Sequence, residues 1–168
     1  KDIKKVKTKV FKDKRGFFKE IYKNKILKKN FIFDVMSYSK KGILRGLHIQ
    51  TKFPQAKLIT VTSGKIMDVA VDLRKNSKSF GKYYSTIISQ DSDFSLFIPE
   101  GFAHGFQCLE AGSELLYLHT AFYNSEAEGG IHFEDPCLDI NWPLPVTDLS
   151  ARDNQHSFLG PDYKGITL

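Results

Sequence analysis

The sequence contains few of the residues that mark disulfide-rich, zinc-binding or membrane proteins. It has two cysteines, Cys108 and Cys137, with no Cys-x-x-Cys or Cys/His spacing, so neither a disulfide framework nor a zinc site is predicted. No apolar run approaches the roughly 18 residues of a membrane-spanning helix, and the lysine-rich start has no apolar signal segment behind it. These absences predict a soluble, cytoplasmic protein that does not bind a membrane.

Acidic residues are in the minority, because 25 lysines and arginines face 19 aspartates and glutamates and give a net charge of +6. Much of the basic excess lies before residue 30, where lysines are scattered among apolar residues. Nucleic-acid-binding surfaces usually gather their basic residues on one face, often beside aromatic residues. We therefore predict no nucleic-acid partner and a lysine-rich surface around a site for an anion.

Helical periodicity is almost absent, and alternation with a period of two dominates. The length of 168 residues and the hydrophobic content of 41% fit a single domain spanning residues 1–168. Short alternating runs separated by turn residues predict an all-β sandwich or barrel. We expect strands at 58–62, 65–73, 83–89, 94–98 and 114–122, a helical turn at 25–30 and one short helix in the C-terminal tail.

The clearest expected element is a hairpin in which Ser63-Gly64 joins strands 58–62 and 65–73. Alternate side chains of the second strand point to opposite faces. The face expected to form core carries the apolar side chains of Met67, Val69, Val71 and Leu73. The other face carries the carboxylates of Asp68 and Asp72.

Half of a metal-binding pattern surrounds two histidines. The run from Pro99 to His104 matches the Pro-x-Gly-x-x-His element of cupin jelly rolls, whereas Gln50 stands where a second histidine would follow His48. Two histidines and an amide are a poor ligand set for a transition metal. The residues therefore predict no metal, and a polar pocket suited to proton transfer.

The neighbours of these histidines support a pocket, although each allows a structural explanation. Gly46 predicts a bulge that would turn Arg45 and His48 to the same side. Lys57 is either an edge lysine or a charge aimed inward. Asp68 either pairs with a surface lysine or orients a histidine, and Tyr117 shares a strand face with His119.

Six short blocks follow one another along the chain and resemble the dTDP-4-dehydrorhamnose 3,5-epimerase family. The resemblance covers about residues 11–153 and implies a cupin-type double-stranded β-helix, or jelly roll, with short helical segments near the termini. It also implies a cofactor-independent isomerase of sugar nucleotides, on a path to activated L-rhamnose or a related polysaccharide sugar. The blocks are DKRGFFKE (13–20), KGILRGLH (41–48), QAKL (55–58), DVAVDLR (68–74), IPEGFAHGF (98–106) and NWP (141–143).

The resemblance implies four catalytic roles on a nucleoside-diphosphate 4-keto-6-deoxyhexose. His48 matches the base that removes a proton at C3 or C5, and Asp153 matches the partner that orients its imidazole. Lys57 matches the cation at the enolate oxygen, and Tyr117 matches the acid that returns a proton from the opposite face.

The resemblance also implies a substrate-binding set and a homodimer. Arg15, Phe18 and Glu20 match residues that bind the nucleobase, typically from the neighbouring subunit. Residues expected to bind the sugar and diphosphate, or to orient those that do, are Ser37, Arg45, Asp68, His104 and Tyr123.

One departure from the family pattern leaves the substrate open. Family members commonly carry Gln-x-Asn before the position of Ser37, and here Phe33 and Val35 stand in their place. Alternatives are therefore an epimerase acting at C3 or C5 alone, and one acting on a CDP- or GDP-linked 4-keto sugar. A catalytically silent cupin that binds a sugar nucleotide is the alternative of another class.

Overall fold

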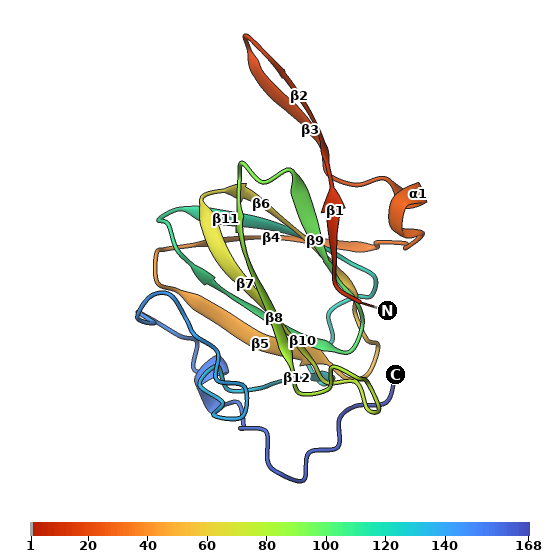
Figure 1. Ribbon diagram of the computed structural model, residues 1–168, viewed down its shortest axis with the longest axis vertical. Coiled ribbons are helices and arrows are strands. Elements are labelled where there is room, and N and C mark those ends of the chain that lie inside the picture. Colours follow the sequence, from red (N-terminus) through yellow and green to blue (C-terminus); the bar gives the residue numbers. More distant parts are fainter. Residues whose placement is uncertain (1) are drawn as a thin grey trace.

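Two five-stranded antiparallel sheets face each other and form most of the molecule (Figure 1). The computed structural model describes residues 2–168. The first sheet has the order β1 (Lys4–Lys7), β9 (Phe94–Ile98), β6 (Lys57–Ser63), β11 (Ser113–His119) and β4 (Phe33–Ser39). The second has the order β12 (Glu128–Gly130), β5 (Leu44–Gln50), β10 (Phe102–Cys108), β7 (Lys65–Asp72) and β8 (Tyr83–Ser89).

Within residues 2–168, regular helix is limited to two short segments, α1 (Asn24–Leu27) and the 3-10 helix η1 (Asp153–Gln155). Their positions agree with the helical turn and the tail helix predicted from the sequence. The all-β jelly-roll prediction is confirmed by this architecture. No helix in the described part of the chain is long and apolar enough to cross a membrane.

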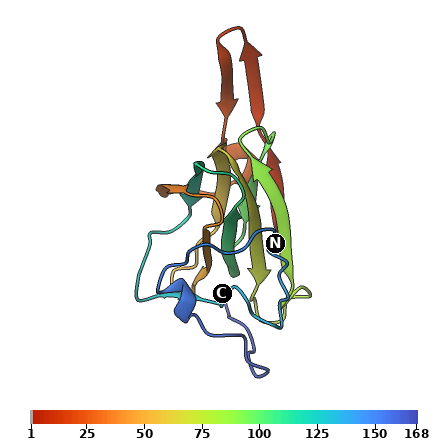
Figure 2. The same ribbon diagram turned by 90° about the vertical axis from the view of Figure 1, so that its left-hand side faces the viewer.

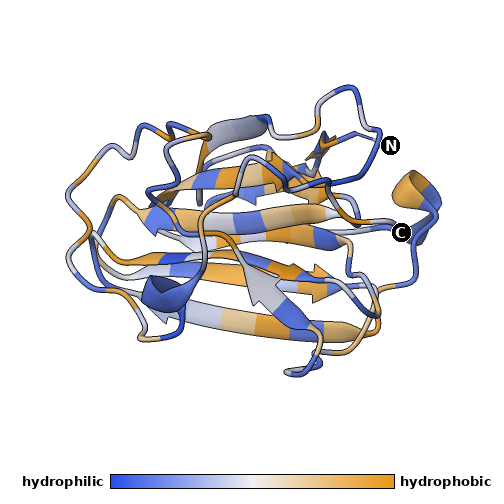
Figure 3. Ribbon diagram, turned by 90° about the horizontal axis from the view of Figure 1, so that it is seen from below, coloured by the Kyte–Doolittle hydropathy of each residue, from blue (hydrophilic) through white to orange (hydrophobic). Residues whose placement is uncertain are grey.

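The main core lies between the sheets, where alternate side chains of facing strands meet, and the strands show alternating hydrophobic and hydrophilic residues (Figure 3). Burial of this apolar surface is the main favourable contribution to folding. Residues at its centre are Ile59, Ile66, Ile88, Leu96 and Leu115.

The predicted division of side chains between the two faces of β7 is confirmed, but both faces are buried, so the prediction of a single core face is wrong. Ile66 and Ala70 point into the main core, whereas Val69 and Val71 belong to a second cluster. That cluster is completed by Ile131 and other residues of the irregular segment that follows β12. The outer face is buried because this segment, which has no strand periodicity, covers it.

The predicted hairpin is also wrong, because β6 and β7 lie in different sheets. Gly64 turns the chain from one sheet to the other with a φ of +74°. A Cβ on this glycine would lie 2.5 Å from the Ser113 Oγ atom, so the turn is both left-handed and crowded. The alternation had located two strands correctly, but a period of two carries no information about the partner of a strand.

A bulge in β5 confirms the prediction made for Gly46. His48 pairs with His104 and Arg45 pairs with Phe106, so β5 uses one more residue than β10 between these pairs. Gly46 has a φ of +122°, and a Cβ there would lie 2.5 Å from the Gly105 Cα atom. Close approach of the two backbones therefore requires glycine, and the bulge lets Arg45 and His48 reach the same cavity.

A two-stranded ribbon, β2 (Lys9–Asp13) and β3 (Gly16–Glu20), projects from the body of the molecule (Figures 1 and 2). Phe17 and Phe18 on β3 are both largely exposed, as is Phe11 on β2. Exposed aromatic side chains on a projecting ribbon are typical of a surface that another molecule covers.

Candidate active site

A cavity of about 360 Å³ opens between the two sheets. This volume lies at the lower end of the range for small-molecule sites. Both sheets contribute side chains to its wall. The lining residues are Phe33, Val35, Ser37, Arg45, His48, Gln55, Lys57, His104, Gly105, Phe106, Tyr117, His119, Tyr123 and Glu128.

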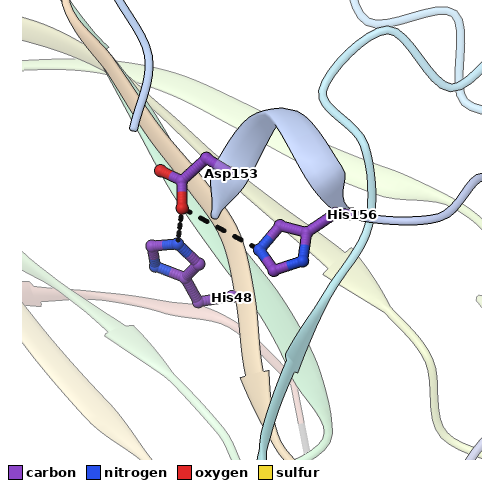
Figure 4. A group of neighbouring side chains, drawn as sticks. All are labelled: His48, Asp153 and His156. Atoms are coloured by element: carbon purple, nitrogen blue, oxygen red, sulfur yellow. Dashed lines mark hydrogen bonds and ion pairs between the residues drawn. The ribbon is translucent and has the colours of Figure 1, made fainter. Parts of the chain in front are cut away.

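His48 and Asp153 form a hydrogen-bonded dyad at one side of this cavity (Figure 4). The His48 Nε2 and Asp153 Oδ1 atoms are 2.7 Å apart, and the Gly46 amide donates to Asp153 Oδ2 at 3.2 Å. Burial acts to raise the pKa of Asp153, but the hydrogen bonds from His48 and Gly46 outweigh it and hold this pKa well below its ordinary value. The carboxylate therefore stays ionised and fixes the imidazole.

A second pair, His104 and Asp68, lies deeper in the same cavity. Asp68 Oδ2 is 2.9 Å from His104 Nε2, and both side chains are almost fully buried. Burial lowers the pKa of His104, while the Asp68 charge opposes this effect. The prediction that Asp68 orients a histidine agrees with this contact.

Lys57 places a positive charge inside the cavity rather than at a solvated edge. Its ammonium group has no hydrogen-bond or ion-pair partner among residues 2–168. Burial lowers its pKa to about 8, against the attraction of Glu128 and Asp68. An ammonium without a protein partner is available to a negatively charged atom of a ligand.

Tyr117 reaches the cavity from β11, in the sheet opposite to that of His48. Its hydroxyl lies 2.9 Å from the Ser37 Oγ atom. Burial raises the pKa of Tyr117 well above its ordinary value, so the phenol stays protonated at neutral pH. Tyr117 can therefore donate a proton into the cavity from the wall opposite His48.

The sequence interpretation missed the role of Glu128 in the cavity wall. Tyr123 Oη donates to Glu128 Oε2 at 2.9 Å, and Arg152 Nη1 donates to the same oxygen at 2.5 Å. These contacts tie the loop after β11 to the segment that carries Asp153. Glu128 lies on a strand of three residues, too short for any periodic signal.

Phe33 and Val35 form an apolar part of the wall at the positions that depart from the family pattern. The Phe33 ring packs 5.5 Å from that of His119 and 6.1 Å from that of Phe122, measured between centroids. Burial, followed by the Lys57 charge, lowers the pKa of His119 to about 4, so this imidazole is neutral. Phe33 and Val35 therefore offer no side-chain hydrogen bond to a ligand at this part of the wall.

Gln50, which stands at a cupin metal-ligand position, is used by the backbone instead. Its Nε2 atom donates to the carbonyl oxygens of Phe53 and Phe122, and its Oε1 atom accepts the amide of Asn124 at 2.8 Å. The side chain therefore ties the backbone at Phe53 to the backbone at Phe122 and Asn124.

Three of the predicted binding residues do not reach the cavity of their own chain. Arg15, Phe18 and Glu20 lie on or beside the projecting ribbon, and Arg15 forms an ion pair with Asp13 there. All the other predicted site residues line the cavity or contact a residue that does so.

His156 is a further residue that the sequence interpretation missed. It directly follows η1, and its Nε2 atom lies 3.9 Å from Asp153 Oδ1 (Figure 4). Within residues 2–168 this buried nitrogen has no hydrogen-bond partner.

The fold and the cavity together define a jelly-roll enzyme equipped for proton transfer, with an oriented imidazole, a protonated phenol and a buried ammonium around one site. The family model described as dTDP-4-dehydrorhamnose 3,5-epimerase matches residues 1–160. The chain belongs to this family, whose members are isomerases that epimerise C3 and C5 of a 4-keto sugar.

Individual relatives agree with this assignment. A dTDP-4-dehydrorhamnose 3,5-epimerase of Neisseria gonorrhoeae is 43% identical over 90% of this chain, which spans about half (48%) of that relative. The enzyme of the same name from Bacillus anthracis, solved with TDP and PPi bound, is 38% identical, with a TM-score of 0.90 and 94% of each chain covered. A dTDP-6-deoxy-D-glucose-3,5-epimerase from Legionella pneumophila, in complex with dTDP-4-keto-L-rhamnose, is 36% identical, with a TM-score of 0.87, 94% of this chain and 93% of that chain covered.

Proposed function

We propose that this protein epimerises C3 and C5 of a nucleoside-diphosphate 4-keto-6-deoxyhexose of the dTDP-4-dehydro-6-deoxyglucose type. The observation that carries the proposal is the placement of His48 and Tyr117 on opposing sheets around one cavity. Inversion of a carbon centre requires removal of a proton from one face and its return to the other, and this arrangement supplies both groups.

His48 acts as the base. Asp153 accepts the Nε2–H group, so the Nδ1 lone pair remains free to remove the proton next to the C4 ketone. The ionised Asp153 also stabilises the imidazolium that forms, as an aspartate does beside other catalytic histidines.

Lys57 stabilises the enolate that results. Negative charge develops on the C4 oxygen, and an unpaired ammonium in a partly desolvated cavity interacts with it more strongly than in water. The proton of Tyr117 then returns to carbon from the opposite face, and Ser37 holds its hydroxyl in place.

We infer that the protein is a homodimer and that the nucleotide end of the substrate is bound between its two subunits. Arg45, His104 and Tyr123 line the cavity and contact the sugar and diphosphate. The ribbon β2–β3 projects away from its own body (Figure 2), which supports a dimer in which Arg15, Phe18 and Glu20 complete the site of a neighbouring subunit. The TDP bound to the Bacillus anthracis relative supports a nucleotide ligand.

The two cysteines form no disulfide, which is consistent with the reducing environment of the cytoplasm, the compartment that we propose.

The apolar wall at Phe33 and Val35 favours a second candidate. Without amides at these positions, the sugar is held by fewer polar groups on that side. An epimerase acting at one carbon, or on a CDP- or GDP-linked sugar, is compatible with this wall.

Solvent deuterium incorporation tests the proposal. In D2O, the wild-type protein with the dTDP-linked 4-keto sugar is expected to exchange the hydrogens at both C3 and C5. Tyr117→Phe removes the returning acid, so exchange at the His48 face is expected to continue while inverted product falls by about 10²-fold. Tyr84→Phe on β8 is the matched control and should leave both rates unchanged.

Two outcomes would contradict the proposal. Exchange at one carbon only would leave a single-centre epimerase, and a panel of CDP- and GDP-linked sugars would then identify its substrate. Absence of both deuterium exchange and inverted product in the wild type would leave a sugar-nucleotide-binding protein.

A further inference from the structure

The dyad aspartate has a second histidine beside it. His48 and His156 approach the same Oδ1 atom of Asp153, at 2.7 Å and 3.9 Å, and Figure 4 shows the two rings on different sides of that oxygen. The two rings meet edge to face with centroids 5.7 Å apart. Three ligand atoms, one from each residue, all lie within 4.8 Å of one another.

The His156 ring is held in this position by packing rather than by a hydrogen bond. Its edge lies against Gly130, where a Cβ atom would come within 2.3 Å of Nε2. The same nitrogen is buried and has no hydrogen-bond partner in the described chain. Buried polar atoms in native proteins nearly always have a partner, so an unpaired ring nitrogen next to a carboxylate indicates a group that binds there.

We propose that His48, Asp153 and His156 bind a divalent transition metal ion of the Zn²⁺ class, and that this ion inhibits the enzyme. Two imidazoles and one carboxylate are a ligand set that suits Zn²⁺ and leaves a position open for water. Nitrogen ligands select such an ion over Mg²⁺ or Ca²⁺.

Small movements bring the three atoms to coordination distance. Zn–N and Zn–O bonds of about 2.1 Å in a tetrahedron place neighbouring ligand atoms about 3.4 Å apart. The His48–Asp153 contact at 2.7 Å must open, and the Asp153–His156 contact at 3.9 Å must close, each by less than about 1 Å. The three ligand atoms lie within 4.8 Å of one another, so the remaining pair, between the two histidines, must close by at most about 1.4 Å.

Arg152 is the charge that opposes a cation at this site. Its Nε atom lies 3.6 Å from Asp153 Oδ1, but its Nη1 atom is paired with Glu128 and half of its side chain is exposed. The guanidinium can therefore move toward solvent while Asp153 and Glu128 remain as negative charges near the ion.

Inhibition follows from the tautomer of His48 and rests on the base role proposed above. A metal ion on Nε2 displaces the proton that now bridges to Asp153, so the neutral ring must carry its proton on Nδ1. The nitrogen that accepts the substrate proton then has no free lone pair. The ion therefore blocks the base without occupying the sugar site.

Metal binding is tested first on the protein without substrate. Wild-type protein titrated with Co²⁺ is expected to give the visible absorption of a four-coordinate ion, and Zn²⁺ should displace it. His156→Gln is expected to weaken both ions by more than the roughly tenfold cost of disturbing an outer-shell partner. His132→Gln makes the same change at a histidine outside the three-ligand group, whose ring packs on Phe133 and Phe158 beside the His156 segment, and should bind as wild type does.

Turnover is tested second. Zn²⁺ is expected to inhibit the wild type and EDTA to restore it, whereas His156→Gln, measured against its own rate without metal, should need at least tenfold more Zn²⁺ for half-inhibition. His156→Ala, with circular dichroism as a folding check, gives the same comparison if the glutamine variant is unstable.

The outcomes separate the two proposals. Equal Co²⁺ affinity in wild type and both His156 variants, or no four-coordinate spectrum in wild type, would overturn the metal site. Binding that depends on His156 but leaves turnover unchanged would support the ligand set and overturn the assignment of His48 as the base.

Discussion

Two histidine–aspartate pairs share one cavity, and they differ mainly in how they are buried and anchored. The His48–Asp153 pair has a hydrogen bond of 2.7 Å and a histidine side chain that is 21% exposed. The His104–Asp68 pair has a similar distance of 2.9 Å, but its histidine side chain is only 4% exposed. The same two residue types therefore meet in two different environments.

The hydrogen bonding of the two aspartates indicates which pair can exchange protons. Both oxygens of Asp153 are bonded, one to His48 and one to the Gly46 amide, so this carboxylate is stable as an anion. In Asp68 only Oδ2 is bonded, and Oδ1 is buried without a hydrogen-bond partner in residues 2–168. We infer that the first pair performs proton transfer and that the second orients a group that binds the substrate.

Replacing each histidine by glutamine gives the largest expected contrast. His48→Gln removes the base, and kcat is expected to fall by about 10³- to 10⁴-fold, the upper range for a general base. His104→Gln removes a binding group, so the expected change is about 10- to 100-fold and lies mainly in KM. Steady-state kinetics with the 4-keto sugar nucleotide measures both.

Deuterium exchange provides the control for this pair of variants. His104→Gln should still exchange both substrate hydrogens at saturating substrate, and His48→Gln should exchange neither. A kcat loss in His104→Gln as large as in His48→Gln, with KM unchanged, would make the buried histidine a second base.

Replacing each aspartate by asparagine is expected to give a smaller contrast. The Asp153→Asn amide can donate to Nε2 and so favour the His48 tautomer with Nδ1 protonated, and kcat is expected to fall by about 10²- to 10³-fold. Asp68→Asn leaves kcat within about tenfold, because the deeper pair transfers no proton. Kinetics at saturating substrate measures both values.

Thermal unfolding of the same variants shows whether a loss of kcat comes from misfolding rather than from the lost carboxylate. Each asparagine has nearly the volume of the aspartate it replaces, so both variants should unfold cooperatively near the wild-type temperature. Equal kcat losses in two well-folded variants would remove the distinction between the pairs.

Periodicity located the strands that carry the site, and the family resemblance assigned roles to residues on them. Lys57 and Tyr117 occupy positions whose alternate neighbours are core residues, and the glycine at Gly46 indicated the bulge that turns Arg45 and His48 to one side. Strand locations followed from the same alternation. These features depend on local periodicity and backbone sterics, which a single sequence carries.

The rest depends on segments without periodicity. Asp153 meets a residue 105 positions earlier in the chain, and only the family resemblance placed them together. Glu128 and His156 lie on a three-residue strand and just after η1, and no pattern pointed to either. The false hairpin has the same origin, because strand partners are chosen by packing of the whole chain.

Lys57 is coupled by charge to the buried His104–Asp68 pair, and its titration gives the smallest predicted effect. Burial lowers its pKa to about 8, so the ammonium is present below that pH and is lost as the pH rises through it. Turnover is therefore expected to fall above about pH 8, since a neutral amine stabilises the enolate poorly. Lys57→Arg, which stays charged, should remove this fall even if its rate at pH 7 is lower.

The two aspartate variants use the titration of Lys57 to test the difference between the His48–Asp153 and His104–Asp68 pairs. Asp68 is one of the charges that raise the pKa of Lys57, so Asp68→Asn is expected to move the high-pH fall downward, on the order of half a pH unit. Asp153→Asn lowers the rate but should leave the position of the fall unchanged. pH–rate profiles of kcat for the three proteins measure this. If Asp153→Asn moved the fall as far as Asp68→Asn, the ammonium would be coupled to the dyad as strongly as to the buried pair, and the separation of roles between the two pairs would not hold.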